Sequence, residues 1–268
     1  MIPTRTAQPA PDYVPAHNLL AGRRVVVTAA AGAGTPAGAA RRALEEGAQL
    51  VVLGDTHAGR LEAAVAELGA EFGTDRVRAA VCDVTVDEQV EALLDLAEDA
   101  GGVDVMINNA GLGGTASILE MTDEQWDKVL GVTLTGTFRS VRAAGRRMVR
   151  NGVQGGVIIN NASVIGWRAQ EGQAHYAAAK AGVMALTRSA ALDLAHAGIR
   201  VNAVSPSLAM HPFLAKVTSE ELLEQLTSRE AFGRAAEPWE IANVMVFLAS
   251  GYSSYMTGEV VSVSSQQA

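Results

Sequence analysis

The sequence has little of several residue types that mark particular protein classes. A single cysteine, Cys82, stands among its 268 residues, so the chain has no disulfide framework of its own. Cys82 closes an apolar run, which predicts a buried, unreactive thiol. The five histidines show no spacing typical of a metal site. Aromatic residues make up only 4%, against 49% hydrophobic residues overall, so the core is expected to consist mainly of alanine and branched aliphatic side chains.

Long hydrophobic runs and an excess of positive charge are also lacking. No stretch approaches the roughly 20 apolar residues that a membrane-spanning helix requires, and the first residues have no apolar core of a signal peptide. The formal net charge of -8 disfavours nucleic acid and anionic membranes as partners. We therefore expect a cytoplasmic protein that acts on a small molecule and binds no metal.

What the chain contains, from Arg23 onward, is an alternation of apolar runs and amphipathic segments. Runs of strand length alternate with segments of helix length, which is typical of repeated βαβ units. The pattern predicts an α/β fold with one Rossmann-type, doubly wound parallel sheet of about seven strands and helices on both faces. Strands are expected at 24–28, 50–54, 77–82, 103–107, 157–161, 199–204 and 259–263. Helices are expected near 37–47, 57–70, 86–100, 123–150, 174–197, 218–229 and 237–250.

The first part of the chain has a different character. Residues 1–19 include four prolines, which oppose both helix and sheet, so we expect an arm that is either disordered or draped over a neighbour. Residues 20–268 show no break in composition and are expected to form a single domain.

Ser163, Tyr176 and Lys180 together predict a proton-transfer site. Tyr176 and Lys180 are four residues apart, so they share one face of a helix. A cation beside a phenol favours the phenolate, and we expect Lys180 to lower the pKa of Tyr176 towards the working pH. Ser163 follows the predicted strand 157–161, so its hydroxyl emerges at the carboxyl edge of the sheet, where α/β proteins bind ligands. A Tyr-x-x-x-Lys pair alone is common by chance, and its weight comes from the motifs around it.

A glycine-containing turn follows the first strand. Gly32 and Gly34 allow backbone N–H groups to approach a pyrophosphate at the start of a helix. Pro36 has no N–H to donate but suits the first turn of a helix. The alternatives are a working phosphate site and a turn that has kept its shape but lost its affinity.

Asp55 ends the second strand. A carboxylate in this place accepts hydrogen bonds from an adenosine ribose and repels a 2′-phosphate, which favours NAD over NADP. The other reading is that Asp55 only caps the following helix.

These motifs, in this order, resemble the short-chain dehydrogenase/reductase family from about Leu20 to Ser265. The resemblance implies hydride transfer between NAD(H) and a secondary alcohol or ketone. In it Tyr176 exchanges a proton with the substrate oxygen, Lys180 lowers the pKa of that tyrosine and holds the ribose, and Ser163 fixes the carbonyl oxygen. A serine hydrolase is disfavoured, because Ser163 lacks a Gly-x-Ser-x-Gly elbow.

The resemblance also implies further contacts. Asp83 and Val84 correspond to the adenine side of the cofactor, and the segment 207–233 corresponds to a substrate lid. The default assembly of the family is a homotetramer, with a homodimer next. The remaining positions expected along the cofactor are Asn109, Ala110, Gly111 and Pro206.

Several positions depart from the family pattern, among them Ala29, Pro36, Thr133 and Ser207. Where the family usually has an asparagine that supports a proton relay, Thr133 keeps an oxygen able to hold water but is expected to bond within its own helix. His175 is expected to face outward. The departures keep open an alternative function, a non-catalytic binding or assembly subunit with a weakened cofactor site.

Within the family, the chain is most similar to reductases of the 3-oxoacyl carrier-protein type. More narrowly it resembles a subgroup of bacterial steroid ring degradation that acts on bicyclic indane CoA thioesters. The residues that carry this likeness are the Ser163 region and the segment that begins at Ser205. The expected substrate is therefore an apolar or acyl-CoA-type alcohol or ketone, with a steroid-derived bicyclic CoA thioester as the narrower expectation.

Overall fold

The sheet of this protein contains seven parallel strands. The computed structural model describes residues 11–210 and 220–265. In it the strand order is β3-β2-β1-β4-β5-β6-β7, and every neighbouring pair is parallel. The predicted fold class is confirmed. The strands are β1 (Arg24–Thr28), β2 (Leu50–Asp55), β3 (Val77–Val81), β4 (Val105–Asn108), β5 (Val157–Asn161), β6 (Arg200–Pro206) and β7 (Val260–Val263).

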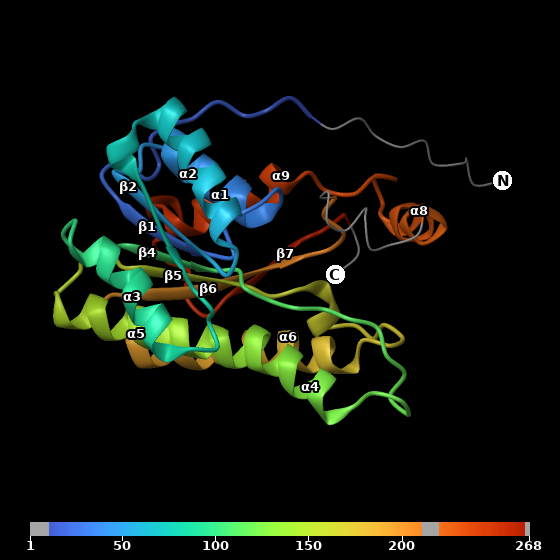
Figure 1. Cartoon of the computed structure of the whole chain (residues 1–268). Coiled ribbons are helices and arrows are strands. Elements are labelled where there is room, and N and C mark those ends of the chain that lie inside the picture. The colour runs from blue at the N-terminus through green and yellow to red at the C-terminus, as the bar shows by residue number, and fades with distance from the viewer. Residues whose placement is uncertain (1–10, 211–219, 266–268) are drawn as a thin grey trace.

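Helices cover both faces of the sheet (Figure 1). One face carries α1 (Thr35–Glu45), α2 (Ala58–Phe72) and α9 (Pro238–Ala249). The opposite face carries α3 (Asp87–Glu98), α4 (Asp123–Leu130), α5 (Gly136–Arg150) and α6 (Ala174–Ala195). Helix α8 (Glu220–Arg229) lies beyond the sheet, and short 3₁₀ turns occupy Thr74–Arg76, Val164–Gly166 and Gly251–Ser253.

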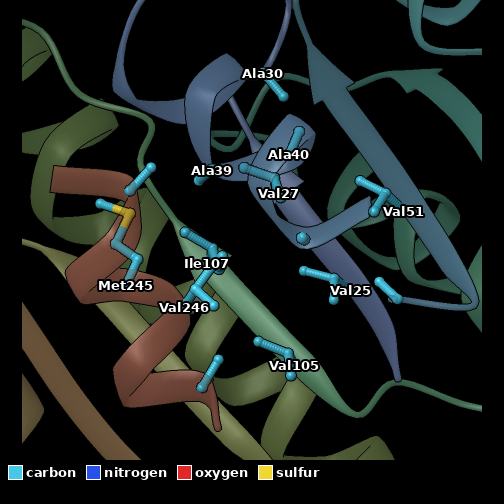
Figure 2. Packing of buried hydrophobic residues seen from close by; sticks show 14 of the residues in the cluster. Val25, Val27, Ala30, Ala39, Ala40, Val51, Val105, Ile107, Met245 and Val246 are labelled. Carbon is cyan, nitrogen blue, oxygen red and sulfur yellow. The ribbon is translucent and has the colours of Figure 1, made fainter. Parts of the chain in front are cut away.

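Successive residues of the central strands enter two different cores. Val25 and Val27 of β1 pack with Ile107 of β4 and with Met245 and Val246 of α9 (Figure 2). Because side chains alternate along a strand, the intervening Val26 belongs to the opposite core, under α3 and α5. A sheet buried on both faces needs strands that are apolar throughout, which explains the unbroken apolar runs of the sequence.

Three predicted elements differ from the structure in ways that matter for the site, while the ends of most others differ by one or two residues. The helix expected at 37–47 begins at Thr35, since the proline next to it is accommodated in the first turn. The strand expected at 103–107 is β4, shifted to Val105–Asn108. The helix expected at 123–150 is divided by a wide π-helical segment, Gly131–Thr135. Insertions of this kind are frequent at functional sites, and this one contains Thr133.

The described part of the arm lies against its own domain. Arg42 of α1 donates to the carbonyl oxygens of Val14 (2.7 Å) and Pro15 (3.1 Å). Its partner Glu46, fully buried, accepts from Arg42 (2.7 Å) and from the backbone N–H of Leu19 (3.0 Å). The ion pair thereby satisfies backbone groups of the arm as well as its own charges.

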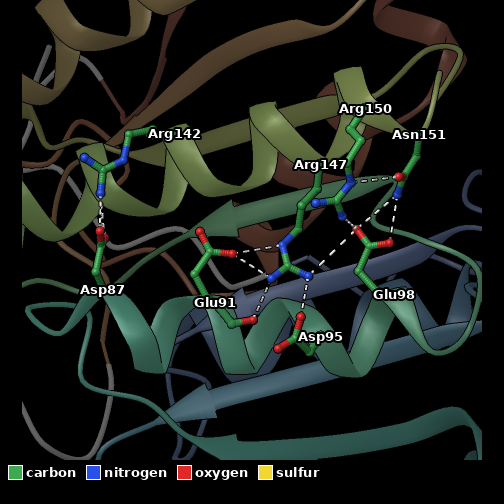
Figure 3. Close-up of polar contacts among 8 residues, drawn as sticks. All are labelled: Asp87, Glu91, Asp95, Glu98, Arg142, Arg147, Arg150 and Asn151. Carbon is green, nitrogen blue, oxygen red and sulfur yellow. Dashed lines mark hydrogen bonds and ion pairs between the residues drawn. The ribbon is translucent and has the colours of Figure 1, made fainter.

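An ion-pair network joins α3 to α5 (Figure 3). Arg147 is only 8% exposed in its side chain, and its guanidinium contacts Glu91 at 2.6 Å and Asp95 at 2.8 Å. It also donates to the backbone carbonyl of Glu91 (3.0 Å). Arg150, one turn further along α5, is 66% exposed and reaches Glu98 only at 3.5 Å. The contribution of the network to stability is therefore expected to reside mainly in Arg147.

The two arginines give a matched test of this difference. Arg147→Ala removes a nearly buried side chain with several charged partners, and we expect the free energy of unfolding to fall by about 2 kcal/mol. Arg150→Ala is expected to change it by less than about 0.5 kcal/mol. Urea denaturation of the three proteins measures both values, and equal losses from the two substitutions would contradict the assignment.

Candidate functional site

The side chains that end three neighbouring strands meet at one edge of the sheet. Thr28 ends β1, Asn108 ends β4 and Asn161 ends β5. The chain runs from β1 outward to β3 and then returns to place β4 on the other side of β1, so the strand order reverses between β1 and β4. Such a reversal opens a crevice at the carboxyl ends of the strands, and ligands of doubly wound proteins bind there.

The glycine turn leaves β1 at this edge. Ala29 adopts a left-handed backbone with φ 56°, which costs a residue with a Cβ roughly 1–2 kcal/mol. Gly32 has φ 150°, and a Cβ added to it would meet no atom within 4 Å. The turn is thus open on the side of Gly32, where a ligand can approach the backbone closely.

Helix α1 begins directly after this turn with its N-terminus uncapped. Gly34 precedes it and provides no side-chain hydrogen bond, and the first turn has no acidic residue. The N–H groups of a first helical turn lack partners within the helix and carry partial positive charge. The start of α1 therefore suits a phosphate group, although Pro36 removes one of the available donors.

Asp55 connects β2 to the glycine turn. Its carboxylate accepts from the backbone N–H of Ala31 (3.1 Å) and of His57 (3.0 Å). Arg60, which is 54% exposed, lies 3.5 Å from the same carboxylate. Helix α2 begins after His57 with no side-chain cap hydrogen bond, so Asp55 does not cap it. The contact with Ala31 instead places the carboxylate beside the glycine turn.

Asp83 and Val84 lie after the neighbouring strand β3. Asp83 accepts from the backbone N–H (2.8 Å) and the hydroxyl (2.7 Å) of Thr85. The Val84 side chain is buried, and a Cβ at Gly136 would collide with it. Only the backbone of Val84 is therefore expected to contact a ligand.

The turn after β4 is fastened to β1. The backbone N–H groups of Asn109 and Ala110 both donate to the hydroxyl oxygen of Thr28, at 3.0 and 3.2 Å. Gly111 follows, and a Cβ added there would lie 3.5 Å from Nζ of Lys180. The turn therefore lies directly beside the catalytic candidate Lys180.

Lys180 is buried in the site. Its Nζ donates to the backbone carbonyl of Asn161 at 2.5 Å and lies 5.5 Å from the centre of the Tyr176 ring. Burial lowers the pKa of Lys180 to about 8, because removal from water disfavours the charged ammonium.

Tyr176 differs from the prediction. Burial raises the pKa of its phenol, a hydrogen bond with Ser163 opposes that rise, and Lys180 is not among the causes. The expectation that Lys180 lowers the pKa of Tyr176 is wrong. The physical reason is that removal from water disfavours the phenolate more than the lysine, 5.5 Å from the ring centre, favours it. Ser163 itself is buried and also accepts from the N–H of Ile165 (3.3 Å).

Thr133 also departs from its prediction. Its hydroxyl accepts from the N–H of Leu112 (3.0 Å) and donates to the carbonyl of Leu112 (3.3 Å). It therefore bonds across to the turn after β4, and the expected bond within its own helix is wrong. The π-helical segment widens the helix at this point, and Thr137 instead donates to the Thr133 carbonyl (2.7 Å). Thr133 holds one wall of the site in place.

His175 is buried, with 2% of its surface exposed, so the prediction that it faces outward is wrong. Its Nδ1 accepts from the backbone N–H of Tyr176 (2.9 Å). Gly114 lies against the other side of the imidazole, since a Cβ there would be 3.3 Å from Nε2. The loop after β4 thus packs on the start of α6 through a glycine, which local sequence periodicity does not reveal.

The far side of the site is described in part. Pro206 ends β6 and is buried. The next residue, Ser207, donates its N–H to the carbonyl of Val263 (3.2 Å). Residues 211–219 of the predicted lid lie outside the described residues.

The structure brings Ser163, Tyr176, Lys180, Gly111 and Thr133 together, and it joins Asp55 to the glycine turn. Sequence reasoning did not single out Thr28 and Asn161 as parts of the site. A signal was present, since each is a polar residue that ends an otherwise apolar strand. Such residues point to the ligand-binding edge of a parallel sheet.

Comparison with known proteins assigns the chain to a family. A family model described as enoyl-(acyl carrier protein) reductase matches residues 29–265. A short-chain dehydrogenase structure from Mycobacterium smegmatis is 53% identical, covers 97% of this chain and 99% of its own, and superposes with a TM-score of 0.84. The chain belongs to the short-chain dehydrogenase/reductase family. It is an oxidoreductase, and the cofactor of this family is a nicotinamide nucleotide.

Two relatives have named activities. A protein of Mycobacterium tuberculosis named (5R,7aS)-5-hydroxy-7a-methyl-1-oxo-2,3,5,6,7,7a-hexahydro-1H-indene-carboxyl-CoA reductase is 58% identical over 96% of this chain and 97% of its own. A 3-oxoacyl-[acyl-carrier-protein] reductase of Thermotoga maritima is 37% identical over 82% of this chain and 87% of its own. The narrower resemblance stated from the sequence is confirmed. Among residues 11–210 and 220–265, no helix combines the length and apolarity needed to cross a membrane.

The lowered pKa of Lys180 predicts a dependence of stability on pH. Below about pH 8 both the folded and the unfolded chain hold the proton, and the full burial cost is present. From there towards 10.5, the value for an unfolded lysine, the folded chain releases its proton first, so stability rises with pH.

Lys180→Met removes this titration. We expect the methionine variant to be the more stable protein near neutral pH, with an advantage that shrinks by about 2 kcal/mol between about pH 7.5 and 10. Denaturant unfolding of both proteins across this range measures the difference, in which other titrating groups largely cancel. A constant difference would mean that Lys180 titrates as an exposed lysine.

Proposed function

We propose that this protein is an NAD-dependent reductase that transfers hydride between the nicotinamide and a secondary alcohol or ketone on an apolar bicyclic CoA thioester. The observation that carries the chemistry is the cluster of Ser163, Tyr176 and Lys180 at the carboxyl edge of the sheet. The bicyclic substrate is inferred from the 58% identity to the indene-carboxyl-CoA reductase over nearly all of both chains.

In this proposal Tyr176 is the proton donor for ketone reduction. A phenol whose pKa is raised by burial remains protonated at neutral pH, as a donor must. Ser163 orients the substrate oxygen by a hydrogen bond, and its existing bond to Tyr176 places the two hydroxyls side by side. Lys180 holds positive charge near the ring and favours the phenolate that remains after the proton has left.

The residues of the first half of the chain fit a dinucleotide. When bound, the nicotinamide supplies or accepts the hydride. Gly32 and the uncapped start of α1 offer a place for the pyrophosphate. Asp55 retains acceptor capacity beyond its two backbone bonds and can bind a ribose hydroxyl, while its charge opposes a 2′-phosphate. Asp83, Val84, Asn109, Ala110, Gly111 and Pro206 are assigned to the same groove.

The assembly and the location of the protein follow the same resemblance. We propose a homotetramer or homodimer in the cytoplasm, with contacts through the helices α4, α5 and α6. Phe138 of α5 and Leu192 of α6 are exposed by 42% and 79%, which gives these helices apolar surface to bury.

Replacing Tyr176 by Phe tests the proton donor. Loss of the phenol is expected to reduce kcat by about a thousandfold or more, since general acid catalysis contributes up to about 10⁴ and no other acid replaces it. The assay follows NADH consumption with a bicyclic CoA-linked ketone, and a linear 3-oxoacyl-CoA serves as the comparison substrate. NADH binding, measured by fluorescence, is expected to be retained. Turnover unchanged in the variant would overturn the catalytic assignment, and absence of turnover in the wild-type protein would favour the binding-subunit alternative.

Replacing Asp55 by Asn tests the cofactor. The amide keeps one oxygen for the backbone N–H groups but loses the charge that repels a 2′-phosphate. The wild-type protein should be stabilised by NADH, by about 2.7 kcal/mol at a hundred times the dissociation constant, and much less by NADPH. In the variant we expect the ratio of the two dissociation constants to shift by about tenfold in favour of NADPH. Thermal unfolding with each cofactor measures it, and an unchanged ratio would place the discrimination elsewhere.

A further inference from the structure

The only hydrogen bond recorded for the Lys180 ammonium within the described residues runs to the backbone carbonyl of Asn161 (2.5 Å). The position of this carbonyl follows from the strand. The next N–H, of Ala162, donates to Val204 on β6. Because a trans peptide directs C=O and N–H to opposite sides, the Asn161 carbonyl faces the β4 side. The β4–β5 ladder ends with Asn108 and Asn160, so the carbonyl is free to accept from Lys180.

The side chain of the same residue is held from a third strand. Asn161 Nδ2 donates to Asn109 Oδ1 at 2.6 Å, and the Asn109 N–H donates to Thr28. A chain of contacts therefore runs from the end of β1, through the turn after β4, to the partner of Lys180. The start of this chain, Thr28, is also the first residue of the glycine turn.

The Asn161 amide is not explained by stability alone. Its Oδ1 is buried and has no hydrogen-bond partner within the described residues. An unpaired buried oxygen opposes folding, so an apolar residue here would avoid a cost that asparagine incurs. The benefit of the amide must lie on its donor side, which faces Asn109.

Thr133 also lies near Lys180, but its hydroxyl is not what positions the ammonium. Its hydroxyl is occupied as acceptor and as donor by the backbone of Leu112. A Cβ at Gly111 would lie 3.5 Å from Lys180 Nζ and 3.6 Å from the Thr133 hydroxyl, so both groups lie beside Gly111. The task of fixing the ammonium falls to Asn161.

We propose that Asn161 is a positioning residue: its side chain, tied to Asn109, fixes the carbonyl that holds the Lys180 ammonium beside Tyr176. This inference rests on the catalytic role that the proposed function gives to Lys180. It assigns a role in the proposed site to a residue at the end of β5. Through Asn161, Lys180 is connected to the turn after β4, which lies beside the proposed cofactor site.

Asn161→Ala removes the tie, and Asn160→Ala is the matched control. Asn160 is the preceding residue of β5, and its amide donates to Thr187 of α6 (2.9 Å), on the opposite face of the sheet. Both variants lose one side-chain amide from the same strand. The control also loses the acceptor of the Asn108 amide (2.9 Å), but only Asn161→Ala loses the connection to Asn109. Asn161→Ser, a smaller change that cannot span the distance to Asn109 as the amide does, is used if the alanine variant does not fold.

The first readout is the pKa of Lys180 itself, which requires no substrate. The chain has only three lysines, Lys128, Lys180 and Lys216, so NMR of the protein with isotope-labelled methylated lysines is readily assigned with Lys180→Arg. We expect the pKa of Lys180 to rise by about one unit in Asn161→Ala, as the released ammonium reaches water, and to stay unchanged in Asn160→Ala.

The second readout is turnover. We expect kcat of Asn161→Ala to fall about tenfold with KM changed by less than about twofold, and the acid-base limits of its pH profile to move. An Asn161 variant in which Lys180 titrates as in the wild-type protein would overturn the inference. If no protein in the series turns over substrate, the proposed function fails, while the lysine titration still decides whether Asn161 positions Lys180.

Discussion

The constraint on which this structure depends is the burial of a parallel sheet on both faces. Val25, Val26 and Val27 must all be apolar, because α1 and α9 cover one side and α3 and α5 the other. Ligand-binding polar side chains are thereby favoured at the ends of the strands. At the carboxyl edge, the reversal of strand order between β1 and β4 brings Thr28 and Asn109 into hydrogen-bonding contact. The site is assembled from strand ends, where polar side chains can reach a ligand. A polar residue inside a strand, such as the fully buried Asn202 of β6, is instead occupied by the backbone of Met256 and Glu259.

The same burial tunes the two central ionisable groups in opposite senses. It lowers the pKa of Lys180 to about 8 and raises that of Tyr176, since each neutral form is favoured away from water. In the proposed reaction, the protonated phenol gives its proton to the ketone, and the neighbouring lysine then stabilises the phenolate. Burial thus keeps the Tyr176 phenol protonated, and the position of Lys180 near the ring lowers the free energy of the phenolate in the proposed reaction.

The predictions that were wrong concern contacts between distant segments and the extent of burial. Thr133 was expected to bond locally, but the wide turn at Gly131–Thr135 directs its hydroxyl to Leu112. His175 was expected to face outward, but the loop after β4 folds over it with Gly114 at the contact. Lys180 was expected to govern the pKa of Tyr176, yet burial outweighs it. The outcomes for Thr133 and His175 depend on a loop whose course leaves no periodic signal in the sequence, and the outcome for Tyr176 depends on burial.

The sequence by itself determined the strands, their parallel arrangement and the presence of Ser163, Tyr176 and Lys180 at a helix start and a strand end. These features are local, because hydrophobic periodicity and four-residue spacing fix which side chains share a face. Only the tertiary structure decided which partner each of these side chains hydrogen-bonds to. Lys180 reaches Asn161, and Asn161 reaches Asn109, across gaps of 19 and 52 residues. Such bonds depend on where separate strands end in space, and on how far burial has removed each group from water.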